Sequence, residues 1–539
     1  MAAGILASRL LGFVRDATLA LFVGAGPHLD VFRQAMRSGN LIQNLLGEQT
    51  LSAAFIPQYS RLLEEGREED AGRFAGAIFG FLVVVAGVLA LVGIFFAGPI
   101  VAVFNPGYLR DAADVAAGTA TVNRFPIAVR LVRWLFPMAG VLVLSAWSIG
   151  VLNSHRRFFA AYFAPVLWNV SIITGLWLVG GSMLPNAASD DGLERLLMAG
   201  AVGALIGGGL QFLVQLPFVI GVIRGFRLSL STEVRGVRQA LGAFWPMLAG
   251  RGAVQLSGHL DGFIASFLMA GAQGILGFAL TLYLLPLSLF GLSVAAAELP
   301  EISRLDATSG PEVSRRVAST IKRSSFFVVP TAIGYLFFGF LIVGAIYGRG
   351  QFGEVDRWLM YFVLASYSVG LPASGVTRQM NTVFYALGRT RIPARVGVER
   401  VLLSAAIGGP LAFFLDRFAV GSVVATGSAK QLYLGAVGLA VGAAIGAWWE
   451  LWRIRVRLAG TVGELQLPIA ALLRMAAAAL TAVVPAASLW YGIAGKLPTP
   501  ASAVLVVTVY AVCYLIVTRA MGVSELEAWI AGLPGRRKR

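Results

Sequence analysis

Arginine, asparagine and glutamate side chains recur at helical spacing near the N-terminus, inside stretches that are otherwise apolar. One row consists of Arg33, Arg37, Asn40, Asn44 and Glu48, which follow i, i+4, i+7, i+11 and i+15. On one continuous helix these positions share a face about four turns long. Guanidinium groups keep their charge and present a fork of donors that fits a phosphate group. The row therefore predicts the wall of a hydrated cavity that attracts an anion.

A second polar row lies upstream of the first. Arg9, Gly12, Phe13 and Asp16 fall at i, i+3, i+4 and i+7, and Arg15 lies to one side of that face. Cations outnumber acids over the two rows, whereas a purely structural ion network tends to balance them. This excess favours an anion-binding cavity. A buried salt-bridge network that locks helices together remains the alternative.

Further polar residues stand in a later apolar stretch. Arg251, Gln255 and Gly258 share a helical face, and His259 and Asp261 flank it. Arg251 is a candidate for the same anion site, and a local helix-packing ion is the equal alternative. His259 is better explained as a hydrogen-bonded interior histidine than as a ligand. Asp261 could pair with a cation or take part in ion coupling.

Arg378 and Asn381 complete the set of candidate cavity residues, in the segment GVTRQMNTVFYALG.

The residue patterns of an enzyme are missing, since the sequence has no nucleophile elbow, no P-loop and no suitably spaced pair of carboxylates. The single cysteine, Cys513, excludes an internal disulfide and a thiolate metal cluster. The three histidines are scattered singly, so a histidine-rich metal site is not expected.

The composition indicates which elements carry these residues. Of the 539 residues, 57% are hydrophobic and 13% are charged, whereas soluble domains carry about a quarter charged residues. An apolar stretch of about 20 residues crosses a bilayer as a helix. We therefore predict an all-α integral membrane protein with about 14 transmembrane helices. The predicted spans are 4–26, 30–58, 74–100, 127–152, 158–183, 197–223, 240–270, 273–299, 324–347, 358–386, 396–415, 432–452, 466–493 and 499–521.

The net charge of +16 is distributed unevenly along the chain. Connections after the even-numbered spans, together with the C-terminal tail, hold roughly three times as many Lys and Arg residues as the other connections, as the positive-inside rule requires. Both termini are therefore expected in the cytoplasm. No basic segment carries the interleaved aromatic residues that suit nucleic-acid binding.

Motifs along the chain resemble the MurJ (MviN) family of lipid II flippases. Ser8-Arg9, Gly12-Phe13 and Arg15-Asp16 are similar to the family's opening SRxxGFxRD. The resemblance continues through Asp30, Asn40-Leu41, Glu48, Ala54-Phe55-Ile56-Pro57, Pro106-Gly107, Phe163-Ala164-Pro165, Asn169, Gln215-Leu216-Pro217, Leu299-Pro300 and Phe384-Tyr385-Ala386-Leu387-Gly388. It runs from residue 1 to about 400, and the last four spans match in hydropathy and number alone.

The resemblance implies the fold of the MOP superfamily. It implies two six-helix lobes in a V, at 1–223 and 224–457, followed at 458–539 by two additional helices that help line a groove for a lipid tail and by a basic cytoplasmic tail. The implied cargo is an undecaprenyl-diphosphate-linked peptidoglycan precursor, moved to the outer leaflet of the bacterial inner membrane by alternating access. By position, the residues that match the family's polar cavity or gate positions are Arg9, Arg15, Asp30, Arg37, Glu48 and Arg378. Together with the polar helical faces described above, this gives the residues expected at the headgroup: Arg9, Arg15, Arg33, Arg37, Asn40, Asn44, Glu48, Arg251, Gln255 and Arg378. Asp16 and Asp30 are expected at a gate.

The sequence departs from the family at several charged positions. Gln43 stands where the family usually has arginine, and the family's charged ADR motif reads Ala279-Leu280-Thr281 here. Leu284 replaces a nearby acid. Arg33 and Arg251 instead occupy positions that are apolar in many members. We expect these two arginines to replace the missing cations.

Other functions stay open at this point. They are a flippase for another polyprenyl-linked glycan, another exporter of the same superfamily, and a non-transporting scaffold of the cell envelope. No cofactor is expected, and energy would come from the membrane potential or a monovalent cation. The expected partners are the lipid-linked precursor, membrane lipids and proteins of cell-wall synthesis, with the chain itself a monomer.

Overall fold

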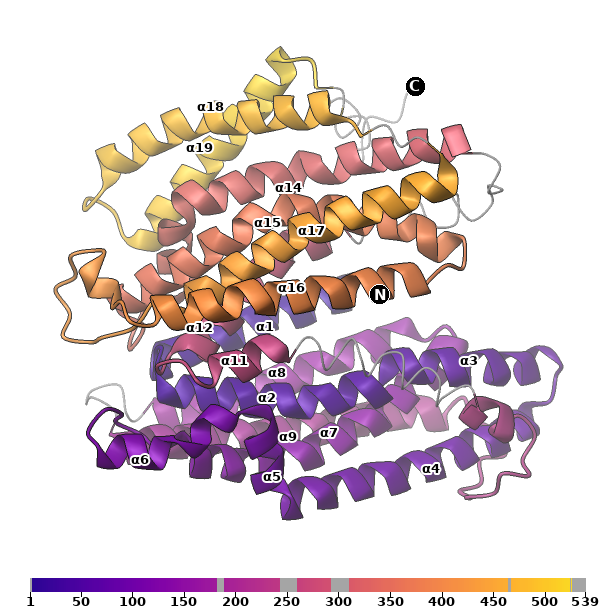
Figure 1. Cartoon of the computed structure of the whole chain (residues 1–539). Coiled ribbons are helices and arrows are strands. Elements are labelled where there is room, and N and C mark those ends of the chain that lie inside the picture. The colour runs from indigo at the N-terminus through magenta and orange to yellow at the C-terminus, as the bar shows by residue number, and fades with distance from the viewer. Residues whose placement is uncertain are drawn as a thin grey trace. The chain divides into compact units, whose positions relative to one another are not determined.

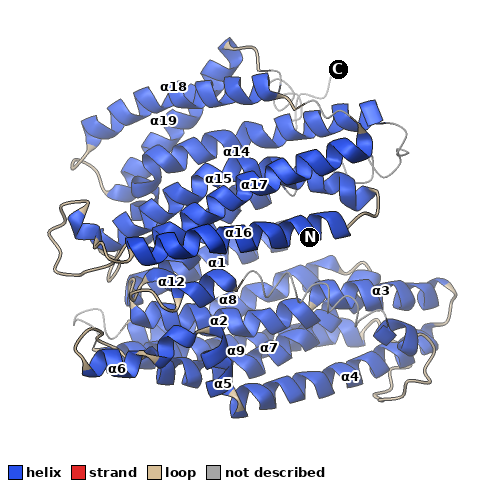
Figure 2. Ribbon diagram, viewed as in Figure 1, coloured by secondary structure: helices blue, strands red, loops and turns tan. Residues whose placement is uncertain are grey.

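A computed structural model describes residues 2–181, 189–242, 259–291, 310–463, 467–523 and 525. Within these ranges the chain is built from helices, and the only β contact is a single bridge between Ala419 and Tyr433 (Figure 2). Eleven helices of the described part are long and apolar enough to cross a membrane. The all-helical membrane fold predicted from composition is therefore confirmed.

The chain divides into two compact units. Unit 1 comprises Met1–Gly274 together with Gly350–Phe352, and unit 2 comprises Ile275–Arg349 and Gly353–Arg539. Helix α11 and the start of α12 belong to unit 1, and the two C-terminal helices pack with unit 2. The lobes expected at 1–223 and 224–457 and the additional segment at 458–539 stay a prediction.

Unit 1 holds the first half of the chain (Figure 1). Its elements are α1 (Ala2–Val23), α2 (Pro27–Leu46), α3 (Glu48–Glu64), α4 (Glu68–Phe95), α5 (Ala97–Phe104), η1 (Pro106–Leu109), α6 (Asp111–Ala116), α7 (Arg124–Ser154), α8 (Phe158–Gly180), α9 (Asp190–Ile220) and α11 (Leu260–Ala265). Helix α12 (Ala272–Pro286) begins in this unit. The central helix is α7, which packs against α2, α4 and α9.

The second predicted span, 30–58, is two helices in the structure. Helix α2 ends at Leu46 and α3 begins at Glu48, on either side of Gly47. The Gly47 amide still donates to the carbonyl oxygen of Gln43 over 2.7 Å, and a Cβ at Gly47 would clash with that oxygen. A glycine is therefore required at this break. The seventh predicted span, 240–270, lies largely in 243–258, outside the described residues.

Unit 2 contains the rest of α12, the π-helical turn η2 (Leu287–Gly291) and the later helices. These are α14 (Gly310–Tyr347), α15 (Glu354–Ala386), α16 (Arg391–Leu415), η3 (Val420–Ser422), α17 (Gly435–Val462), α18 (Ile469–Ile493) and α19 (Thr499–Ala520). Helices α14, α15 and α17 run side by side, and α18 and α19 both pack on α14.

Helix α14 shows why α18 and α19 belong to this unit. Pro330 has no amide hydrogen, so the carbonyl of Phe326 loses its helical donor. The hydroxyl of Tyr514, on α19, donates to that carbonyl over 2.9 Å, and Tyr510 donates to the Pro330 carbonyl over 2.8 Å. The Tyr510 ring also packs against Phe338, and the Tyr514 ring packs against Phe326. Tyrosine hydroxyls of α19 thus supply donors to carbonyls of α14 beside its proline.

Candidate functional site

Two guanidinium groups surround one buried carboxylate at the contact of α1, α2 and α8. Asp16 is 1% exposed, and its oxygens lie 3.0 Å from Arg15 Nη2 and 2.9 Å from Arg33 Nη2. Arg15 Nη1 also donates to Asn169 Oδ1 on α8 over 3.2 Å, and the Arg15 guanidinium lies 5.4 Å from the centre of the Trp168 ring. One acid is thus shared by the guanidinium groups of Arg15 and Arg33.

The polar row of α2 lies on one face of that helix, as the spacing predicted. Arg33, Arg37, Asn40 and Asn44 all fall outside the set of residues that α2 buries against its neighbours. The predicted fifth member, Glu48, belongs to α3, and its side chain lies outside the described residues. The row is therefore four residues long on α2 and faces the less crowded side of the helix.

Arg9 and His259 differ in the contacts that their side chains make. Arg9 is exposed on α1 and has no ion pair within the described part of the chain. His259 Nε2 lies 3.5 Å from the carbonyl oxygen of Arg37, and its ring centre lies 5.6 Å from that of Phe104. These contacts fit the interpretation of His259 as an interior histidine with a hydrogen bond.

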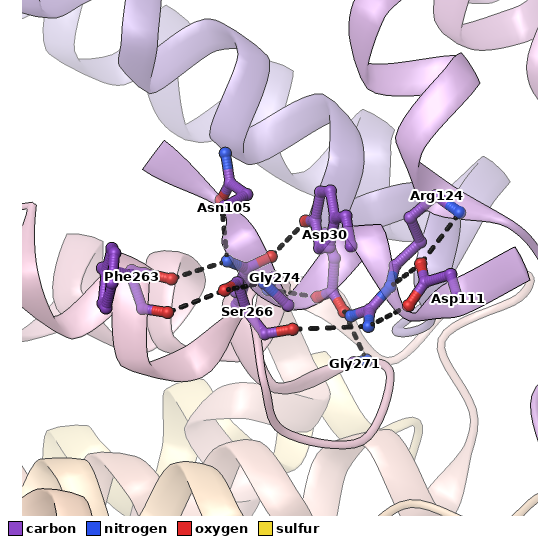
Figure 3. Close-up of polar contacts among 12 residues, drawn as sticks. Asp30, Asn105, Asp111, Arg124, Phe263, Ser266, Gly271 and Gly274 are labelled. Atoms are coloured by element: carbon purple, nitrogen blue, oxygen red, sulfur yellow. Dashed lines mark hydrogen bonds and ion pairs between the residues drawn. The ribbon is translucent and has the colours of Figure 1, made fainter. Parts of the chain in front are cut away.

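Asp30 binds the first turn of α12 (Figure 3). Its carboxylate is fully buried and accepts hydrogen bonds from the Gly271 amide over 2.6 Å and the Gly274 amide over 2.7 Å. The N-terminal turn of a helix has unpaired amides and a partial positive charge, so a carboxylate there is stabilising. Gly271 has φ +100°, which a residue with a Cβ adopts only under strain. Asp30 therefore ties the start of α2 to the start of α12.

Arg124 is the cation that lies beside Asp30. Its guanidinium donates to both oxygens of Asp111, over 2.7 and 2.9 Å, and lies 3.8 Å from Asp30. The same group stands 4.5 Å from the centre of the Tyr108 ring and donates weakly to the Ser266 carbonyl over 3.4 Å. Figure 3 shows Arg124 between the two acids. The direct partner of Arg124 is therefore Asp111, and Asp30 lies farther from it.

Uncharged side chains extend this network to the loop before α6. Gln273 accepts a hydrogen bond from the Tyr108 hydroxyl and donates to Asn105 Oδ1 over 3.1 Å. The Gly107 amide donates to Ser266 Oγ over 3.1 Å. Residues 105–111 are thereby held against α11 and the start of α12. We call this network the α12 anchor. Its side chains are those of Asp30, Asn105, Tyr108, Asp111, Arg124, Ser266 and Gln273.

Sequence reasoning found Asp30 but missed the rest of the α12 anchor. Arg124 and Asp111 lie between the third and fourth predicted spans, where charged residues are ordinary. The turn sequence FNPGY at 104–108 was the one available signal, and it predicts a turn without its contacts.

In unit 2 a second polar cluster surrounds Arg378 of α15. Arg400 Nη1 and Glu450 Oε2 form an ion pair of 2.7 Å between α16 and α17, and Tyr283 and Ser374 share a hydrogen bond of 2.7 Å. Arg378 is half-buried and lies within electrostatic range of both members of the ion pair. Arg400 and Glu450 lie inside predicted spans, so the rule that singled out Arg378 would have found them too.

Two apolar grooves flank α14. The α18 groove, of about 570 Å³, lies between α14, α15, α17 and α18, and its lining includes Ser325, Leu336, Trp448, Arg455 and Ala476. The α19 groove, of about 320 Å³, lies between η2, α14 and α19, and its lining is apolar and aromatic apart from Thr331 and three tyrosine hydroxyls.

The amino-acid sequence matches the family Lipid II flippase MurJ over residues 19–499. The chain belongs to the MurJ family. A probable lipid II flippase MurJ of Vibrio cholerae is 29% identical over 423 residues, which cover 78% of each chain. One from Bdellovibrio bacteriovorus is 31% identical over 401 residues, covering 73% of this chain and 72% of the relative.

Solved structures of MurJ and its superfamily have the same fold. A lipid II flippase MurJ in an inward closed conformation aligns with 96% of this chain and 98% of its own, with TM-score 0.73 at 20% identity. An inward-facing multidrug-resistance MATE transporter of the MOP superfamily covers 84% of this chain with TM-score 0.60. The MOP-type fold expected from the motifs is confirmed. As a MurJ family member, the chain is a multi-pass membrane protein of a transporter family and not an enzyme.

The MurJ assignment does not assign roles to individual residues of this chain. Arg251 and Gln255 lie outside the described residues, so their place in the cavity stays a prediction. The structure brings Arg15, Asp16 and Arg33 together in unit 1 and places Arg378 in unit 2.

Proposed function

We propose that this MurJ family member moves lipid II from the inner to the outer leaflet by alternating access, with its cationic helices binding the diphosphate. One observation carries the proposal: Arg9 of α1 is exposed and has no ion pair among the described residues, while Arg15 and Arg33 both contact Asp16. A diphosphate would supply an anion for Arg9. Guanidinium contacts in a low-dielectric cavity are stronger than in water.

Arg33 has two parts in this proposal. It contacts Asp16 beside Arg15, which places its guanidinium group at the proposed headgroup site. With Arg251, it would supply the cations missing at Ala279-Leu280-Thr281. The hydroxyl of Thr281 donates to the carbonyl of Gly277, four residues earlier, so it is already used within its own helix.

We further propose that the α12 anchor is a gate. Helix α12 starts in unit 1 and continues into unit 2, so a change at its first turn moves a helix that both units share. The Asp30 carboxylate accepts hydrogen bonds from the backbone amides of Gly271 and Gly274 at the end of a helix. These bonds can break without unfolding the helix. Asp16, the other expected gate residue, would act through its two arginines.

The α19 groove is the site that we propose for the polyprenyl tail. Its wall carries no charged residue, and η2, which continues α12, forms one side of it. A polyprenyl tail is uncharged hydrocarbon, so an apolar groove suits it.

For energy coupling we propose the membrane potential, with a bound monovalent cation as the alternative, and no cofactor. Each charge that moves across the membrane contributes about 2.3 kcal/mol per 100 mV. We propose a monomer with both termini in the cytoplasm, acting beside proteins of cell-wall synthesis.

The test is rescue of a bacterium depleted of its own lipid II flippase. Arg9→Ala and Arg15→Ala should abolish rescue at normal membrane expression. Arg195→Ala should not, because Arg195 is an exposed arginine of α9 with no ion pair among the described residues. Melting temperatures in detergent separate lost binding from lost packing. Full rescue by Arg9→Ala and Arg15→Ala would refute the headgroup site.

Arg251→Ala and Arg33→Ala test the replacement of the missing cations in the same assay. Each should abolish rescue while the protein remains folded and inserted. A fully active Arg251→Ala protein would contradict the replacement. Failure of the unsubstituted chain to rescue, despite good expression, would favour another polyprenyl-linked glycan as the cargo, or a scaffold.

A further inference from the structure

The α18 groove differs from the α19 groove in having a cation in its wall. It lies wholly within unit 2, and nearly all of its lining is aliphatic or aromatic. Its charged member is Arg455, an exposed residue near the C-terminal end of α17. Arg455 forms no ion pair within the described part of the chain. The nearby Arg453, in contrast, is 3.1 Å from Glu399.

The groove has the length of one bilayer leaflet. On α14 its lining runs from Ser325 to Leu336, a rise of about 16 Å at 1.5 Å per residue. Half of the hydrocarbon core of a bilayer is about 15 Å. The groove therefore fits a chain that reaches from a membrane surface to the bilayer centre.

Arg455 stands at the surface end of that path. Helix α17 carries Arg453, Arg455 and Arg457 at its C-terminal end, followed by the start of α18, where Ile469 also lines the groove. By the positive-inside rule this end faces the cytoplasm. Trp448 and Trp452 line the same groove and are 48% and 52% exposed. Tryptophan rings prefer the interface between headgroups and acyl chains.

We propose that the α18 groove binds an anionic phospholipid of the cytoplasmic leaflet, with its phosphate on Arg455 and an acyl chain along α14. A basic pocket between helices at the cytoplasmic surface is the kind of site that such headgroups occupy. Because Arg455 lies at one end of an apolar groove, the groove matches a lipid that carries an anionic phosphate group at the end of its acyl chains. The site is separate from the α19 groove and does not depend on which cargo is moved.

Binding is measured on the purified full-length protein in neutral detergent, by native mass spectrometry with added phosphatidylglycerol or phosphatidylcholine. The protein should retain phosphatidylglycerol in preference to phosphatidylcholine. Arg455→Gln should weaken phosphatidylglycerol binding about fivefold, the value of one basic contact at a membrane surface. The matched control is Arg457→Gln, which removes the same charge from the same helix end without altering the groove and should leave the affinity unchanged.

A second pair of variants tests the apolar part. Ala476→Phe should fill the groove and abolish binding of phosphatidylglycerol, whereas Ala477→Phe, at an exposed neighbouring position outside the lining, should not. Melting temperature checks that each variant is folded, and Arg455→Gln tests the site even if Ala476→Phe does not fold. Rescue of lipid II transport is measured separately, so failure of the cargo proposal leaves this test intact.

Three results would overturn the proposal. Equal loss of affinity in Arg455→Gln and Arg457→Gln would mean a diffuse surface attraction. Equal binding of phosphatidylglycerol and phosphatidylcholine would mean an apolar groove without headgroup recognition. If Ala476→Phe abolishes binding of undecaprenyl diphosphate and leaves phosphatidylglycerol bound, the groove holds the cargo's tail instead.

Discussion

Replacing Asp30 by asparagine keeps the shape of the side chain and removes its charge. In the native protein both carboxylate oxygens accept backbone amides at the start of α12. An asparagine can offer its one oxygen to one of the two amides, and its NH₂ group then faces the other. Because Asp30 is fully buried, water cannot replace the lost acceptor.

The size of the effect follows from these two bonds. A buried amide left without an acceptor costs about 1–3 kcal/mol, and a bond to a charged acceptor is worth about 1 kcal/mol more than a bond to a neutral one. Arg124 retains its two bonds to Asp111, so it adds little to the loss. We expect Asp30→Asn to destabilise unit 1 by about 2–4 kcal/mol. At about 2 °C per kcal/mol for a unit of this size, the melting temperature should fall by about 4–8 °C.

The measurement is thermal unfolding of the purified protein in detergent, followed by tryptophan fluorescence, together with the rescue assay. Asp114→Asn is the matched control, because Asp114 lies on α6 near the α12 anchor but has no side-chain bond within the described part of the chain. It should melt like the unsubstituted protein. If Asp30→Asn melts within 1–2 °C of the Asp114→Asn control, about the shift expected from a surface change, the claim that Asp30 holds α12 is wrong.

Three further predictions concern single contacts. Gly271→Ala should lower the free energy of unfolding by about 1–3 kcal/mol because of the positive φ of Gly271. In the double variant with Asp30→Asn the total loss should be smaller than the sum of the two single losses, since both changes weaken the same bonds. Strict additivity would contradict a shared site. Tyr514→Phe should lower the free energy of unfolding by about 1–2 kcal/mol, because it removes the donor to the buried carbonyl of Phe326. The control is Tyr491→Phe, which should change nothing because Tyr491 is 82% exposed. Equal melting temperatures of the two variants would exclude a stabilising role of the Tyr514 hydroxyl. Glu450→Gln should cost about 1–2 kcal/mol by weakening its ion pair with a half-exposed arginine, and an unchanged melting temperature would show that this pair is not stabilising.

Features that repeat at a fixed period could be predicted from the sequence. The polar row of α2 was found because its spacing matches a helix, and the structure places its members on one face. The all-helical fold followed from composition, since a backbone in lipid must satisfy its own hydrogen bonds. The break at Gly47 was missed because Glu48 continues the same helical spacing across it.

Contacts made by backbone amides could not be predicted in this way. Asp30 and Gly274 are 244 residues apart, and one partner is an amide that every residue possesses. The pairing of Asp16 with Arg33 was equally hidden, because both residues were counted as members of separate rows. Periodicity identifies the face of a helix, and only the packed structure identifies the group that faces it.

The pairing around Asp16 bears directly on whether the early cations bind cargo or hold the helices together. A carboxylate that had a single arginine would leave a neutral pair with no attraction for a phosphate. Here it has two arginines, each with about 17–18% of its side chain exposed, while the acid itself is sealed. The acid therefore fixes the direction of both guanidinium groups. In the headgroup site that we propose, this cluster would hold α1 to α2 through its buried carboxylate and would bind a phosphate group through the exposed parts of its guanidinium groups, so a structural role and a binding role do not exclude each other.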